Sequence, residues 1–159
     1  MGRLLSTLYV IKMNTTFLIK VTRFIGGVLL AVLYVKLTTV FLTQYTKLMG
    51  NLLSDTDKIL SVLVAVTLSC VIIFAVNKFI IKAPPILLGA LATMCAFIFF
   101  YIIKPQGNFA ETVSLINGVF MYLHSAVAFI LLLSTPIITG ILMKITYNKA
   151  LQPTAKRGG

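Results

Sequence analysis

Tryptophan is absent from this chain of 159 residues, and titratable side chains are scarce. The sequence holds three Asp and Glu residues and one histidine, against 14 Lys and Arg. Enzymes that transfer protons need positioned acids and bases, and proton-driven pumps use a carboxylate in their path. The composition therefore disfavours both classes, and we expect no catalytic residue.

Cysteine is also rare. Cys70 and Cys95 both lie within apolar runs, without CxxC spacing or a neighbouring histidine. We interpret them as small apolar side chains and expect neither a disulfide nor a metal site. The GxxxxGK[ST] loop of nucleotide-binding proteins and the HExxH motif of zinc proteases are missing as well. No cofactor is expected.

Apolar residues dominate the chain: 59% of it is hydrophobic and 11% charged, with a mean hydropathy of +1.04. Soluble domains carry about 25% charged residues, so lipid is the natural solvent for this sequence. A net charge of +11 would suggest nucleic acid for a soluble protein. Here the basic residues lie between apolar runs, where they set membrane orientation. We expect the lipid bilayer as a partner, and no nucleic acid.

Four apolar segments approach the roughly 20 residues that a helix needs to cross a bilayer. They cover residues 24–43, 59–81, 86–103 and 119–143. A capping pattern at Ser54 and Asp57 precedes the second segment, and Pro84 and Pro85 separate the second from the third. Lipid offers no partner for backbone polar groups, which favours helices. The predicted fold class is all-α: an integral membrane protein with four transmembrane helices in a bundle.

The two ends of the chain differ from this domain, which spans residues 24–147. Residues 1–23 are basic and interrupted by polar side chains, and we interpret them as an interfacial helix or as an extension of the first span. Met13 is an alternative start to Met1. Residues 148–159 are expected to be a disordered tail.

The distribution of Lys and Arg predicts the orientation. One side of the membrane would hold ten of them, namely Arg3, Lys12, Lys20, Arg23, Lys78, Lys82, Lys144, Lys149, Lys156 and Arg157. The other side would hold three, namely Lys47, Lys58 and Lys104. Because cytoplasmic loops are rich in Lys and Arg, both termini are expected in the cytoplasm.

Small residues recur at helical spacing within the spans, where they let helices approach closely. Ser61, Ala65 and Ser69 form such a stripe in the second span, and Gly89 lies in the third. Pro136 and Gly140 are expected to bend the fourth. These residues are our helix-packing candidates. The pattern fits a compact bundle and fits an oligomer interface equally well.

Lys36 is the foremost candidate site residue, because a lysine inside a span is costly and often functional. Two interpretations stay open. The side chain either extends toward the membrane surface or pairs structurally, or it contacts a solute or a lipid headgroup. Asn77 and His124 are the other polar candidates, as hydrogen-bonding partners between helices or as parts of a path. Tyr34, Tyr101 and Tyr122 near span ends are expected to anchor the protein at the membrane surface.

The tail, NKALQPTAKRGG at residues 148–159, resembles the translated end of bacterial integron gene cassettes, where a reading frame runs into the recombination site. This resemblance implies a bacterial protein, hence the inner membrane, and a tail without a function of its own. Such cassettes often carry resistance, toxin–antitoxin, defence or surface functions.

Two short motifs, RFIGG at residues 23–27 and FAVNKF at residues 74–79, are similar to segments of GtrA-like proteins. Members of that family are four-helix membrane proteins linked to the movement of polyprenyl-phosphate sugars. The fourth segment departs from the family, because it ends at Leu142, Met143 and Lys144 without the expected asparagine. The resemblance implies a lipid-linked sugar phosphate as cargo.

Two functions follow from these observations. The leading one is a non-enzymatic protein that handles a small solute or a lipid-linked group, with Lys36, Asn77 and His124 as candidates for the path. The alternative is an immunity, defence or accessory factor that binds another membrane protein or a second copy. The first predicts a polar cleft around Lys36, and the second predicts a closed core.

Overall fold

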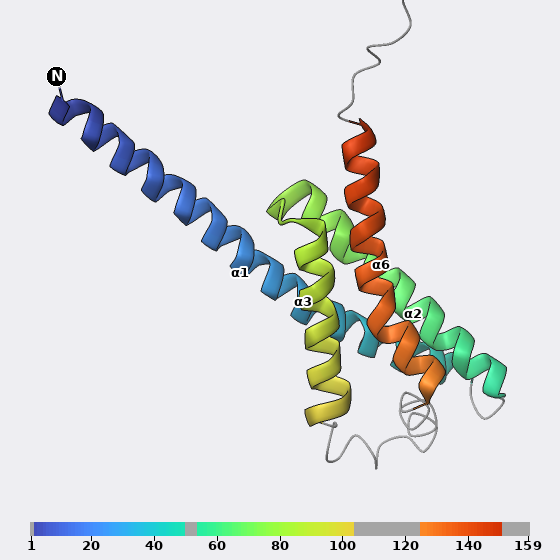
Figure 1. Ribbon diagram of the computed structural model, residues 1–159. Helices are drawn as coiled ribbons and strands as arrows, with labels where there is room; N and C mark the ends of the chain where they lie inside the picture. The colour runs from blue at the N-terminus through green and yellow to red at the C-terminus, as the bar shows by residue number, and fades with distance from the viewer. Residues whose placement is uncertain (1, 50–53, 104–124, 151–159) are drawn as a thin grey trace, which may run out of the picture.

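The computed structural model describes residues 2–49, 54–103 and 125–150 (Figure 1). Every element in these ranges is helical, and four helices are long and apolar enough to cross a membrane. The elements are α1 (Gly2–Met49), α2 (Asp55–Val76), the π-helical turn η2 (Asn77–Ile81), α3 (Pro85–Phe97), the π-helical turn η3 (Ile98–Ile103) and α6 (Ala126–Ala150). The predicted all-α class with four apolar helices is confirmed.

Helix α1 is longer than the predicted first span. It runs without interruption through 48 residues, which is about 72 Å at the helical rise. The segment 1–23 is therefore continuous with the span from Gly2 onward, because no proline interrupts it. At the other end of the chain, α6 continues to Ala150, beyond the predicted end of the fourth span at residue 143. Residues 119–124 and 151–159 lie outside the described ranges.

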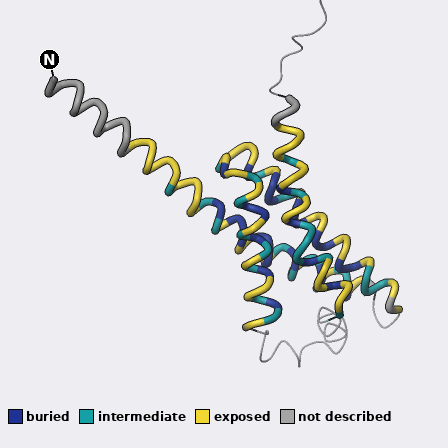
Figure 2. The backbone as a smooth tube through the Cα atoms, viewed as in Figure 1, coloured by how far each residue is buried: buried dark blue, intermediate teal, exposed yellow. Residues whose placement is uncertain are grey.

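The four long helices pack around a shared apolar core. Helix α1 contacts α2 and α3, and α6 contacts the same two helices (Figure 1). Between Thr15 and Gly26 no residue of α1 is buried, and burial begins at Gly27, so this part of α1 extends away from the packed region (Figure 2). The largest fully buried side chains include Tyr34, Leu42, Ile73, Leu88 and Leu132.

Helices α3 and α6 pack closely against each other. A Cβ atom added to Gly89 would lie 2.6 Å from the carbonyl oxygen of Pro136, and one added to Gly140 would lie 2.6 Å from that of Pro85. Backbone therefore meets backbone at two points, one helical turn apart on each helix. Ser61, Ala65 and Ser69 are buried too, so these small residues of α2 face the interior of the chain.

The turn between α2 and α3 is built from residues with defined conformations. The π-helical turn η2 ends at Lys82, whose left-handed backbone has φ 57°. Its amide N–H donates to the carbonyl of Asn77 at 2.7 Å, and Pro84 and Pro85 then start α3. At the opposite end of α2, the Ser54 hydroxyl accepts from the Asp57 amide while the Asp57 carboxylate accepts from the Ser54 amide, which is the predicted capping pattern.

Candidate functional site

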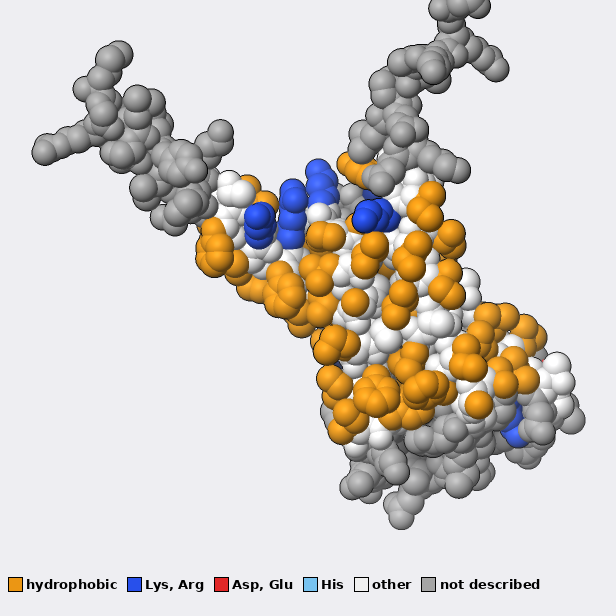
Figure 3. Space-filling view, viewed as in Figure 1, with side chains coloured by type: hydrophobic (Ala, Val, Ile, Leu, Met, Phe, Trp, Pro, Cys, Tyr) orange, Lys and Arg blue, Asp and Glu red, His pale blue; other side chains and the backbone are white. Residues whose placement is uncertain are grey.

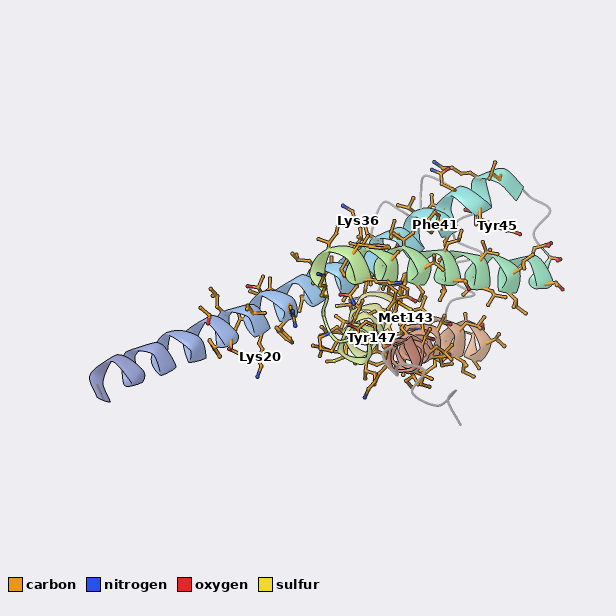
Figure 4. All side chains as sticks on the ribbon, turned by 90° about the horizontal axis from the view of Figure 1, so that it is seen from above. Lys20, Lys36, Phe41, Tyr45, Met143 and Tyr147 are labelled. Carbon is orange, nitrogen blue, oxygen red and sulfur yellow. The ribbon has the colours of Figure 1, made fainter. Side chains whose placement is uncertain are left out.

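Lys36 lies on the outside of the packed helices. Its side chain is exposed and points away from α3 and α6 (Figure 4). Four aliphatic side chains at helical spacing are exposed along the same helix, namely Leu29, Val32, Leu33 and Val40. We call these four residues together with Lys36 the α1 outer face. It is an apolar surface with one positive charge at its centre.

The depth of Lys36 follows from the cations on either side of it. Lys36 lies 13 residues after Arg23 and 11 residues before Lys47. These separations are about 20 Å and about 16 Å along the helix. A lysine side chain has a four-carbon stem, which covers only part of either distance. Lys36 is thus near the centre of the apolar stretch between the two cations.

Within the described part of the chain, Lys36 has no hydrogen bond or ion pair. The acids of the sequence are Asp55, Asp57 and Glu111. Asp57 accepts hydrogen bonds from Ser54 at the start of α2, and Glu111 lies outside the described residues. Among the described residues, the α1 outer face therefore carries a cation without a counter-charge beside it, an arrangement that is unfavourable in an apolar environment.

Asn77, the second candidate, is buried in the turn after α2. Its side-chain NH₂ donates to the Ala83 carbonyl and its oxygen accepts from the Ala83 amide, both at 2.9 Å. Both halves of the amide are thereby used to hold the turn. Since Asn77 is buried and Lys36 is exposed, the two side chains do not line one surface. His124, the third candidate, lies outside the described residues.

Tyr34 is buried rather than exposed at the membrane surface, so its predicted anchoring role is wrong. Pro136 has no N–H, which leaves the Leu132 carbonyl without its helical donor. The Tyr34 hydroxyl donates to this oxygen at 3.0 Å. The Thr93 hydroxyl donates to the next carbonyl, that of Leu133, at 2.8 Å. A proline within a span was the sequence signal that one carbonyl would need a donor from outside its own helical ladder.

Tyr101 lies in η3, the π-helical turn that follows α3, where it is half-buried. Its ring packs edge-on against Phe129 of α6, with centroids 5.0 Å apart. It also stacks on Phe97, one turn earlier, at 5.8 Å. Tyr101 therefore joins α3 to α6 while part of its surface stays open.

Exposed cations gather at one end of the packed region. They are Lys20 and Arg23 of α1, Lys78 of η2, Lys82 of the following turn and Lys144 of α6. Figure 3 shows such side chains at the end from which α1 and α6 extend outward. Lys47 and Lys58 belong to the helix ends on either side of residues 50–53. Apart from Lys36, these cations thus flank the apolar surface at both ends.

A scan against protein-family models and searches of curated proteins and of solved structures found no match to this chain. Among the residues that the structure describes, no group of His, Cys, Asp and Glu could hold a metal ion. Cys70 is buried and Cys95 is half-buried, each as a free thiol. Function is therefore inferred from the surface and the packing of the chain itself.

Proposed function

We propose that this chain is a polytopic membrane protein that binds a second membrane protein through the α1 outer face. The observation that carries the proposal is the exposure of Lys36 on an apolar surface, far from either end of the span. Lipid hydrocarbon solvates an ammonium group poorly. A protein partner would supply both the apolar contact and the polar group that this surface lacks.

The packing of the core supports an interaction role over a transport path. Three polar side chains that could line a path are occupied: Tyr34 and Thr93 donate to carbonyls of α6, and Asn77 bonds the turn. Among the described residues, the buried hydroxyl of Thr38 is the side-chain group left without a hydrogen bond. The small residues of α2 and α3 lie inside the chain. Lys36, the proposed path residue, faces outward instead (Figure 4).

The proposal includes a topology. The four long helices would form a transmembrane bundle in a bacterial inner membrane, with both termini in the cytoplasm. The support is the gathering of Lys20, Arg23, Lys78, Lys82 and Lys144 at one end, because positive charge is retained on the cytoplasmic side. An origin in a gene cassette fits an immunity, defence or accessory factor that acts on a host membrane protein.

Site-specific photocrosslinking in native membranes tests the interaction role. A photoreactive amino acid replaces Val32 or Val40 of the α1 outer face, and Val71, an exposed position of α2, serves as the matched control. We expect a discrete adduct with another protein from positions 32 and 40, and its loss on Lys36→Met. The same adducts from position 71, or none from positions 32 and 40, would refute the proposal.

A second candidate, handling of a lipid-linked anionic group, is favoured by the cations in the N-terminal half of α1 and around η2. Here a phosphate would bind between Lys20, Arg23, Lys78 and Lys82, and Lys36 would lie on its route. Cysteine at position 36, in a chain without Cys70 and Cys95, distinguishes the two roles. Labelling by a membrane-impermeant thiol reagent would show water at mid-span and favour the path. Absence of labelling, with labelled loop controls, favours the interaction role.

A further inference from the structure

We infer that the partner of the α1 outer face is a transmembrane helix of a different protein, with a carboxylate at the depth of Lys36. This inference rests on the proposed function and names the chemistry of the partner. It follows from three observations: the depth of Lys36, the position of the acids in this chain, and the shape of the α1 outer face.

The depth of Lys36 points to a group within the membrane. The predicted first span ends at residue 43, seven residues from Lys36, or about 10 Å along the axis, and Lys47 lies 11 residues away, or about 16 Å. A lipid phosphate lies at that surface, beyond the reach of the four-carbon stem. A carboxylate carried by a neighbouring helix would instead meet the ammonium group where it is.

Among the residues that the structure describes, no acid lies along α1 to offer such a carboxylate to a second copy. Two of its acids, Asp55 and Asp57, lie at the start of α2, and Asp57 is already bonded to Ser54. In a two-fold dimer through the same face, each Lys36 would lie close to the Lys36 of the other copy. Like charges in lipid repel strongly. The partner is therefore a different membrane protein.

The shape of the α1 outer face fits a helix. Leu29, Val32, Leu33, Lys36 and Val40 follow the spacing at which side chains share one side of a helix. The aliphatic residues extend on both sides of Lys36 by about one to two turns. A partner helix lying along them would cover Lys36 from water and lipid. A carboxyl group without a partner is neutral in lipid, whereas Lys36 would favour its ionised form.

The inference is tested with a defined probe. The full chain is reconstituted in phosphatidylcholine vesicles with a 22-residue polyleucine helix that carries one central Glu, and association is measured by energy transfer. The matched probe carries Gln at the same position. We expect the Glu probe to bind about tenfold more tightly than the Gln probe. Lys36→Met, at an exposed position that the core does not use, should abolish the difference.

A relocated lysine provides the sharper control. Lys36→Met combined with Val40→Lys moves the ammonium group by one turn, about 6 Å along the same face. A series of probes with Glu at successive positions should then show its optimum displaced by about four residues. An optimum that does not move would contradict direct pairing between the lysine and the carboxylate.

Equal binding of the Glu and Gln probes would overturn the inference, as would a Glu preference that persists in Lys36→Met. A third variant, Glu111→Gln, tests pairing within the chain. We expect it to leave the preference unchanged, and a large increase would show that Glu111 already neutralises Lys36. Adducts from positions 32 and 40 without a Glu preference would refute the inference that the partner carries a carboxylate, and they would keep the proposed function. A Glu preference without adducts from positions 32 and 40 would refute the proposed function and keep the pairing of Lys36 with a carboxylate.

Discussion

The Tyr34 hydroxyl of α1 donates a hydrogen bond to the Leu132 carbonyl of α6 at 3.0 Å. Leu132 lies four residues before Pro136, so its oxygen is the one that the proline leaves without a helical donor. In lipid no water can replace that donor. The bond thus makes a proline inside α6 tolerable and ties α6 to α1, two helices that are far apart in the sequence.

Removal of the Tyr34 hydroxyl should destabilise the protein only while Pro136 is present. Tyr34→Phe is expected to lower the free energy of unfolding by about 1–2 kcal/mol, because the Leu132 carbonyl is left without a donor. In a Pro136→Ala background, the new N–H satisfies that carbonyl, and the same change should cost clearly less. The unfolding free energies of the wild type, the two single variants and the double variant, measured in mixed micelles, give the coupling energy between Tyr34 and Pro136.

Thr39→Val is the matched control for this cycle. The Thr39 hydroxyl donates to the Val35 carbonyl of its own helix, so its loss leaves the helical ladder intact. We expect a change below about 0.5 kcal/mol. Equal costs for Tyr34→Phe in both backgrounds would show that the hydroxyl does not compensate for the proline.

Asn77 should be indispensable for the turn between α2 and α3. Asn77→Leu removes both bonds to Ala83 and leaves buried backbone groups unpaired. We expect a loss of about 2–4 kcal/mol in the free energy of unfolding. Asn77→Asp, studied at low pH, carries a protonated carboxyl group that can accept from the Ala83 amide and donate to the Ala83 carbonyl, so its loss should be smaller than that of Asn77→Leu. A loss below about 0.5 kcal/mol in Asn77→Leu would contradict this role.

Gly89 and Gly140 should be sensitive to a single methyl group. Gly89→Ala and Gly140→Ala each place Cβ at 2.6 Å from a backbone oxygen of the facing helix. The helices must move apart, and we expect a loss of about 1–3 kcal/mol for each variant. Gly27→Ala is the control, since its Cβ would meet the nearest side-chain atom at 3.4 Å. Similar thermal midpoints for all three variants would show that the α3–α6 contact is not tight.

Lys82 adopts a left-handed backbone that glycine accepts more readily. Lys82→Gly should therefore raise the free energy of unfolding by about 0.5–1 kcal/mol. Lys78→Gly, in the π-helical turn itself, should lower stability by a similar amount, because helical glycine is unfavourable. The two variants remove the same charge, so opposite signs in one unfolding assay isolate the backbone effect. Destabilisation by both would contradict it.

The sequence alone was sufficient for the class of the protein. Runs of about 20 apolar residues and few charges require lipid as the solvent, and lipid requires helices, since each helix satisfies its own backbone. The start of α2 could also be predicted from local sequence, because the capping residues Ser54 and Asp57 are only three positions apart. The long extension of α1 was harder to decide, because no helix breaker marks a boundary within residues 1–23.

Other features depended on contacts between distant parts of the chain. Hydropathy near a span end predicted a surface role for Tyr34, but the residue is buried because Pro136, over a hundred positions later, exposes a carbonyl beside it. Lys36 and Asn77 were both polar residues in apolar runs, and only the packing shows that one faces outward while the other bonds the turn. Periodicity identifies the residues that share a face of a helix, whereas the neighbours of that helix are set by the tertiary structure.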